Sequence, residues 1–211
     1  MKLKVCGMRD PQNLAGLLEQ QPDYVGFIFF PKSKRYVGDA PDPALFAQVK
    51  APVRKVGVFV NAPVGEMEEK ASRYHLDCLQ LHGEESPADC AALKEAGHCV
   101  IKAFSVGEDF DFDTLSPYEG KVDYFLFDTK GKEYGGNGVT FDWTVLRGYP
   151  SNTPFFLSGG IGPEHVEALA GLNELPVHAL DVNSRFELEP ALKNLDMLAD
   201  FKDKLNKTLI A

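Results

Sequence analysis

Short apolar segments alternate with helical patterns along the whole chain, and this alternation limits the fold more than any other feature. The segments are rich in β-branched and aromatic residues, and most are apolar without a break. This pattern is typical of strands that are buried on both faces of a parallel sheet. They lie near residues 2–6, 24–29, 54–60, 77–81, 98–103, 122–128, 154–158 and 178–182.

Helix signals fill most of the intervals between these segments. Asp10-Pro11 and Ser86-Pro87 each pair an N-cap residue with a first-turn proline, and Pro163 and Pro190 are expected to start the last two helices. Residues 104–121 are acidic and poorly periodic, so the fifth helix is expected to be short or missing.

Eight strands in strict alternation with helices predict one α/β domain over residues 1–211, a (β/α)8 TIM barrel. The length is at the small end for such a barrel but allows a well-buried core. A doubly wound open sheet is the alternative, although that fold has less use for eight evenly spaced strands.

Composition excludes several classes of partner. The formal net charge of −9 argues against binding to nucleic acid or to anionic membranes, both of which need a basic face. No apolar run approaches the roughly 20 residues that cross a bilayer, so we expect a soluble protein. We also expect it to be cytoplasmic and to be either a monomer or a homodimer. The four cysteines have no C-x-x-C spacing and the five histidines no metal-ligand spacing, so we expect reduced thiols and no metal.

Polar residues and glycines gather where the predicted strands end. In a barrel of this class the active site lies at the carboxyl ends of the strands, so these residues are the candidates for function. They are Cys6, Gly7, Arg35, Gln80, His82, Asp128, Ser158, Gly159, Gly160, Asp181, Asn183 and Ser184.

Cys6 and Asp128 end the first and sixth strands and can serve as a base and an acid toward one substrate. Lys4 lies two residues before Cys6 on the same strand face, and its ammonium group would favour the thiolate. Asp128 follows apolar residues, and burial there favours the protonated, donating form. The structural alternatives are a core cysteine, a solvated Lys4 and a carboxylate that caps the next turn.

The run Leu157–Pro163 passes from a strand through glycines to a helix start. Free backbone N–H groups there can hold a phosphate, and Asn183 and Ser184 can complete the site. A purely geometric glycine turn is the alternative. The glycines at 135–138 do not form a nucleotide fingerprint, because the third glycine of that motif is absent.

Two further side chains suit substrate contacts. Arg35 lies in a basic island, residues 32–36, and its planar fork suits a carboxylate. His82 can orient or bind a substrate. A solvated loop arginine and a strand-end histidine with a structural role are the alternatives.

As an ordered set, these residues resemble the phosphoribosylanthranilate isomerases of tryptophan biosynthesis over nearly the whole chain. The matching motifs are Lys4–Gly7, Ser33–Val37, Gln80–Gly83, Asp128, Gly135–Gly138 with Phe141–Trp143, Ser158–Ile161 and Asp181–Glu187.

The resemblance implies a cofactor-free Amadori rearrangement of N-(5-phosphoribosyl)anthranilate, a small phosphorylated substrate. Asp128 matches the family's general acid and Cys6 its general base. Arg35 matches the residue near the anthranilate carboxylate, and Gly160, Asn183 and Ser184 fall in the phosphate loops. Lys4, Gln80, His82, Gly159 and Asp181 complete the candidate substrate-binding set.

The chain departs from the family pattern at three positions. Asn137 replaces the usual threonine of the glycine loop, Lys34 replaces a proline, and Arg185 stands where a glycine usually follows Ser184. The remaining alternatives are another phosphate-binding barrel enzyme of tryptophan or histidine synthesis, such as indole-glycerol-phosphate synthase, and a sugar-phosphate-binding barrel without catalysis.

Overall fold

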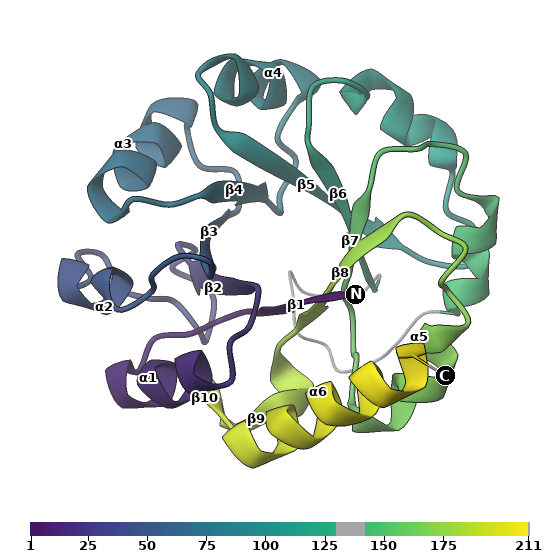
Figure 1. Cartoon of the computed structure of the whole chain (residues 1–211). Helices are drawn as coiled ribbons and strands as arrows, with labels where there is room; N and C mark the ends of the chain where they lie inside the picture. Colours follow the sequence, from purple (N-terminus) through teal and green to yellow (C-terminus); the bar gives the residue numbers. More distant parts are fainter. Residues whose placement is uncertain (130–141, 211) are drawn as a thin grey trace.

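The structure is a computed structural model that describes residues 1–129 and 142–210. Within these residues, eight parallel strands close into a barrel in chain order, with helices outside it (Figure 1). Pairing of the first strand with the last closes the barrel, with Lys4 in register with Asp181. The predicted (β/α)8 barrel is therefore confirmed, and the open-sheet alternative is wrong. The strands are β1 (Lys2–Val5), β2 (Tyr24–Ile28), β3 (Arg54–Phe59), β4 (Cys78–Leu81), β5 (Cys99–Val106), β6 (Tyr124–Thr129), β7 (Phe155–Leu157) and β8 (Val177–Val182).

Local capping explains where several helices begin. The Asp10 side chain accepts a hydrogen bond from the backbone N–H of Asn13 at 2.7 Å, and Ser86 forms a reciprocal capping box with Asp89. No helix in the described ranges is long and apolar enough to span a membrane. The α-helices are α1 (Pro11–Glu19), α2 (Pro43–Ala47), α3 (Val64–Tyr74), α4 (Pro87–Glu95), α5 (Val166–Ala170) and α6 (Leu195–Ile210).

The fifth interval contains only a 3₁₀ helix, Phe112–Tyr118, with Pro117 inside it, so the prediction of a short or missing fifth helix is confirmed. The next interval also holds a 3₁₀ helix, Trp143–Gly148, which Asp142 caps through the N–H of Thr144. The sequence also predicts Thr140 as a cap of this segment, but that residue lies outside the described residues.

The last helix begins at Leu195 and not at Pro190, so that boundary was predicted wrongly. Pro190 lies in the connection between two short antiparallel strands, β9 (Glu187–Glu189) and β10 (Leu192–Lys193). The next residue, Ala191, has a φ of 71°, which is incompatible with an α-helix. This hairpin follows β8 and adds side chains to the mouth of the barrel.

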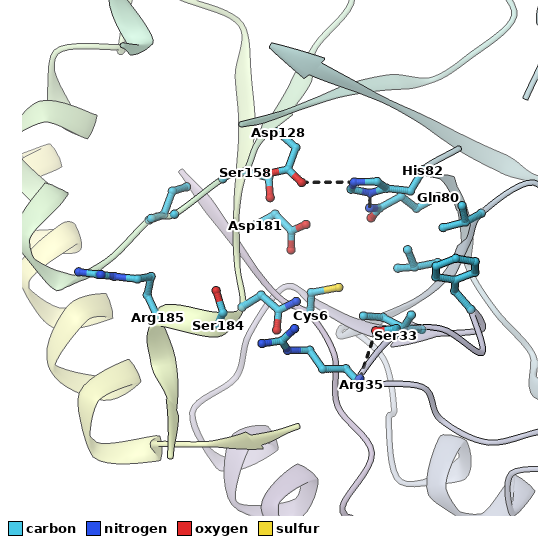
Figure 2. A pocket seen from close by; sticks show the side chains of 18 residues that line it. Cys6, Ser33, Arg35, Gln80, His82, Asp128, Ser158, Asp181, Ser184 and Arg185 are labelled. Atoms are coloured by element: carbon cyan, nitrogen blue, oxygen red, sulfur yellow. Dashed lines mark hydrogen bonds and ion pairs between the residues drawn. The ribbon is translucent and has the colours of Figure 1, made fainter. Parts of the chain in front are cut away.

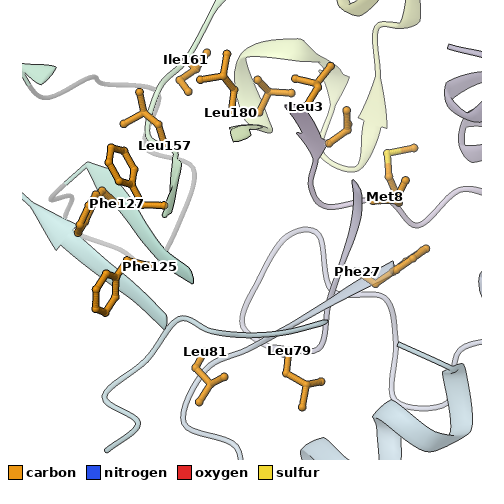
Figure 3. Close-up of a cluster of buried hydrophobic side chains, with 14 of the residues drawn as sticks. Leu3, Met8, Phe27, Leu79, Leu81, Phe125, Phe127, Leu157, Ile161 and Leu180 are labelled. Atoms are coloured by element: carbon orange, nitrogen blue, oxygen red, sulfur yellow. The ribbon is translucent and has the colours of Figure 1, made fainter. Parts of the chain in front are cut away.

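Strand side chains alternate between two cores. One set points outward onto the helices, as Phe125 and Phe127 of β6 and Leu79 and Leu81 of β4 do (Figure 3). The other set fills the barrel, where Cys6 and Leu126 belong to one buried cluster. Because alternation has a period of two, Asp128 shares the inward face with Leu126, just as Lys4 shares it with Cys6.

The outer core predicts a large effect of shortening one aromatic side chain. Phe127 is fully buried, and its ring centroid lies 4.9 Å from that of Phe155 and 5.3 Å from that of Tyr149. We expect Phe127→Ala to lower the free energy of unfolding by about 3–5 kcal/mol in urea titrations. Leu188→Ala, at a residue that is 67% exposed, should change it by less than about 0.5 kcal/mol. Equal effects of the two substitutions would contradict this packing.

Candidate active site

One cavity opens at the carboxyl ends of the strands, and most of the predicted site residues line it (Figure 2). Ten of the eleven residues predicted as catalytic or substrate-binding line it, and Lys4 is the exception. The lining residues are Cys6, Ile28, Phe30, Ser33, Arg35, Val58, Val60, Gln80, His82, Asp128, Ser158, Gly159, Gly160, Ile161, Asp181, Asn183, Ser184 and Arg185.

Lys4 lies inside the barrel and is fully buried, so the solvated alternative is wrong. Its Nζ donates to Gln80 Oε1 and to Asp181 Oδ2, each at 2.8 Å. Burial lowers the pKa of Lys4, but Asp181 and Cys6 raise it by more, and the net shift is upward. Because Lys4 does not reach the wall of the cavity, its placement does not support substrate binding; it supports the side chains that do line the cavity.

Asp181 is the partner of this buried ammonium group. Burial raises the pKa of Asp181, and Lys4 opposes that shift without reversing it. Its Oδ1 accepts no hydrogen bond from the part of the chain that the structure describes. Figure 2 shows the carboxyl group of Asp181 between Asp128 and Cys6, so a ligand in the cavity would meet all three groups.

A chain of side-chain contacts leads from Lys4 to Asp128. Since Gln80 Oε1 accepts from Lys4, its amide nitrogen is left to donate to Nδ1 of His82, 2.9 Å away. A neutral His82 then carries its hydrogen on Nε2, which lies 3.3 Å from Asp128 Oδ2. The other carboxylate oxygen of Asp128 accepts from the N–H of Thr129 at 2.9 Å. The network therefore fixes both the His82 tautomer and the orientation of Asp128.

Cys6 lies at the end of β1 with its sulfur against Gly26 of β2. A Cβ atom at Gly26 would lie 2.7 Å from Sγ, so only glycine leaves room for this thiol. Burial raises the pKa of Cys6, while Lys4 and Lys193 lower it by less. Lys4 thus acts in the expected direction, but burial outweighs it, so the net shift of the Cys6 pKa is upward.

The glycines after β7 bring the backbone close to Asp128. Gly159 has a φ of 90° and Gly160 a φ of 64°, both in the left-handed region that glycine occupies readily. A Cβ atom on Gly159 would lie 2.4 Å from the backbone nitrogen of Thr129 and 2.9 Å from Asp128 Oδ1. These glycines, with Ser184, line the cavity on the side expected to bind phosphate. The guanidinium of Arg185 pairs with Glu164, which directs its charge away from that side (Figure 2).

Two functional candidates that sequence reasoning missed hold Arg35 in place. Glu187 accepts from Arg35 Nε at 2.8 Å and from Nη2 at 2.6 Å. Lys193 Nζ donates to both Glu187 Oε1 and Asn183 Oδ1 at 2.6 Å. No local sequence pattern identified Lys193, because its position was assigned to the last helix. Its ammonium group reaches the site only because of the β9–β10 hairpin.

The loop that holds Arg35 is further fixed by hydrogen bonds to its backbone from two side chains, Ser33 within the loop and Arg9 outside it. The N–H of Arg35 donates to Ser33 Oγ at 3.1 Å, and Arg9 donates to the carbonyls of Lys34 and Tyr36 at 3.5 and 3.3 Å.

In residues 1–129 and 142–210 no group of three or more His, Cys, Asp or Glu side chains could hold a metal ion. The glycines at 135–138, with Asn137, lie outside the described residues.

Comparison with known proteins places this geometry in a family. A family model described as N-(5'phosphoribosyl)anthranilate (PRA) isomerase matches residues 3–204. The N-(5'-phosphoribosyl)anthranilate isomerase of Parabacteroides distasonis is 49% identical over 203 residues, covering 95% of this chain and 91% of that protein.

Solved structures agree with the sequence comparison. The phosphoribosyl anthranilate isomerase of Thermotoga maritima superposes with a TM-score of 0.88 at 34% identity, covering 98% of this chain and 99% of that one. A phosphoribosyl anthranilate isomerase in complex with reduced 1-(o-carboxyphenylamino)-1-deoxyribulose 5-phosphate gives a TM-score of 0.84 at 30% identity, with the same coverage. The fold, the contents of the cavity and these relatives together establish that the chain belongs to the N-(5'-phosphoribosyl)anthranilate isomerase family.

Proposed function

We propose that the protein converts N-(5-phosphoribosyl)anthranilate into 1-(2-carboxyphenylamino)-1-deoxyribulose 5-phosphate by an Amadori rearrangement in tryptophan biosynthesis. The observation that carries the proposal is that Cys6 and Asp128, which are distant from each other in the sequence, line one cavity. A relative that binds the reduced form of this product supports the same substrate class. We further propose that the reaction takes place in the cytoplasm, and a monomer or a homodimer remains our prediction.

The two ends of the cavity suit the two charged ends of this substrate. The N–H groups around Gly159 and Gly160, with Ser184, provide donors for the phosphate. Glu187 occupies the Nε and Nη2 edge of Arg35, so the Nη1 side of the guanidinium is the part that can face the anthranilate carboxylate. A substrate held at both ends would place its ribose between Cys6 and Asp128.

In the first step, Asp128 donates a proton to the ring oxygen of the ribose while the bond from C1 to that oxygen breaks. The nitrogen lone pair forms the C1=N bond of a protonated Schiff base. Asp128 becomes a carboxylate, which the Nε2–H of His82 faces at 3.3 Å. This contact stabilises the charge that forms on the acid.

In the second step, Cys6 removes the proton on C2, and the electron pair moves to C1 and nitrogen to give an enolamine. Loss of the C2 hydroxyl proton and protonation of C1 then give the ketone. C2 is oxidised as C1 is reduced, so the electrons balance within the substrate.

The base must lose its own proton before it acts. Burial raises the pKa of Cys6, while the ammonium groups of Lys4 and Lys193 lower the cost of forming the thiolate. Thiolate formation is therefore the step in which the buried cations contribute.

Two single substitutions test the acid and base roles. We expect Cys6→Ala and Asp128→Asn each to reduce kcat by at least about 10²–10⁴-fold, the usual contribution of a positioned acid or base. The measurement is the loss of anthranilate-substrate fluorescence, with circular dichroism to show that the fold is intact. Cys90→Ala and Asp123→Asn, which lie outside the cavity, should keep normal turnover.

Substantial activity in either site variant would remove the assigned role. Turnover of indole-glycerol-phosphate synthase substrate, or binding of a reduced product analogue with no turnover by the wild-type chain, would favour the alternatives of another barrel enzyme or a binding protein.

The contact between Gln80 and His82 predicts a specific effect of Gln80→Glu. A carboxylate at this position accepts from Lys4 and from His82, which draws the ring hydrogen to Nδ1 and away from Asp128. We expect kcat to fall at least about tenfold with little change in KM. Gln48→Glu is the control. An unchanged kcat in Gln80→Glu would show that the His82 tautomer has no role.

Lys193 predicts a shift in the pH dependence of the base. Because its charge lowers the pKa of Cys6, Lys193→Met should raise that pKa further. The acidic limb of the kcat/KM profile should then move to higher pH, because a nearby positive charge that favours the thiolate has been removed. The exposed substitution Lys50→Met should leave the acidic limb in place. If Lys193→Met raises KM and leaves the pH profile unchanged, Lys193 does not act on the base and serves only to hold Arg35.

A further inference from the structure

Two of the four cysteines meet in the barrel interior, at the end opposite the cavity. Cys78 is the first residue of β4 and Cys99 the first of β5, and the two are paired in register on neighbouring parallel strands (Figure 1). Their sulfur atoms lie 2.6 Å apart. Paired residues in a sheet are separated by about 4.8 Å, which is within the 4.4–6.8 Å that a disulfide requires between Cα atoms. A bond between these sulfurs therefore needs no change in the strand pairing.

The two thiols differ in access. Cys78 is only 1% exposed and belongs to the cluster that fills the barrel, whereas Cys99 is partly exposed and packs on its edge. A small reagent that approaches the amino-terminal end of the barrel therefore meets Cys99 first. Cys78 lies directly behind it.

The electrostatic surroundings of the two thiols also favour reaction at Cys99. Cys78 donates its S–H to Cys99, which lowers the pKa of Cys99 and raises that of Cys78. The guanidinium of Arg54, held over the ring of Tyr24 and bonded to the carbonyl of Asp77, adds a positive charge beside both sulfurs. The accessible thiol is thus the one that forms a thiolate more readily, which is the form that reacts with oxidants.

We propose that Cys78 and Cys99 form an oxidation site that hydrogen peroxide converts into a disulfide. The Cys99 thiolate attacks one peroxide oxygen, the O–O bond breaks, and hydroxide leaves, which gives a sulfenic acid at Cys99. Cys78 then loses its proton, attacks the Cys99 sulfur and expels hydroxide. The two thiol protons convert the two hydroxide ions into water. In sum, one hydrogen peroxide molecule and two thiols give one disulfide and two water molecules.

The other two cysteines serve as internal controls. Cys90 is fully buried in α4, and burial raises its pKa to about 11. Cys6 is 4% exposed and lies at the opposite end of the barrel. Neither sulfur is paired with another cysteine as Cys78 and Cys99 are.

The test treats the folded wild-type protein with one equivalent of hydrogen peroxide and then alkylates the free thiols after unfolding. We expect the free thiols to fall from four to two, with full recovery after reduction. Cleavage by trypsin and a glutamate-specific protease separates Cys78 from Cys90, because Glu84 and Glu85 lie between them. The cross-linked fragment should contain Cys78 and Cys99 only.

Variants assign the order of the steps. Cys78→Ala should accumulate a sulfenic acid at Cys99 that dimedone traps, Cys99→Ala should leave Cys78 reduced, and Cys90→Ala should give the wild-type cross-link. The proposal is overturned if four thiols survive in the wild-type protein, if Cys6 or Cys90 enters the cross-link, or if Cys99 is oxidised to the sulfinic acid with Cys78 still free.

Discussion

One buried ammonium group organises the candidate active site. Lys4 is enclosed by the barrel, where an unpaired charge would be very costly, and it is balanced by Asp181 from β8 and by the amide oxygen of Gln80 from β4. These partners then constrain others: Gln80 sets the tautomer of His82, and His82 orients Asp128. The ion pair also spans the seam between β1 and β8 that closes the barrel, so barrel closure and acid placement depend on the same contact.

A second set of charges ties together the loops around the cavity. Glu187 and Lys193 come from a hairpin that follows β8, and they hold Arg35 from the loop after β2 and Asn183 from the end of β8. Lys193 is fully buried, so its charge acts on both Glu187 and Cys6 with little screening by solvent. Arg35 is proposed to bind the substrate carboxylate, and Cys6 is proposed to remove the proton on C2 of the substrate. The ammonium group of Lys193 therefore influences both of these groups.

The two ends of the barrel interior bear different chemistry. The carboxyl end contains the proposed acid Asp128, the proposed base Cys6 and the glycine loop, whereas the amino end contains the Cys78–Cys99 pair beside Arg54, Tyr24 and His178. Leu126 and Phe156 belong to the buried cluster that fills the barrel between them. Oxidation at one end and isomerisation at the other can thus be measured separately.

The amino-acid sequence by itself determined the strand and helix alternation, the barrel, the reduced fifth helix and the positions of Cys6 and Asp128 at strand ends, because period-two burial and capping signals are local. It also indicated the family through an ordered set of motifs. The tertiary structure alone decided that Lys4 does not line the cavity but holds side chains that do. It also decided that burial outweighs the charge of Lys4 in setting the pKa of Cys6, and that Lys193 lies at the site. These outcomes depend on desolvation and on side chains brought together from distant strands, and neither quantity is encoded in any local stretch of residues.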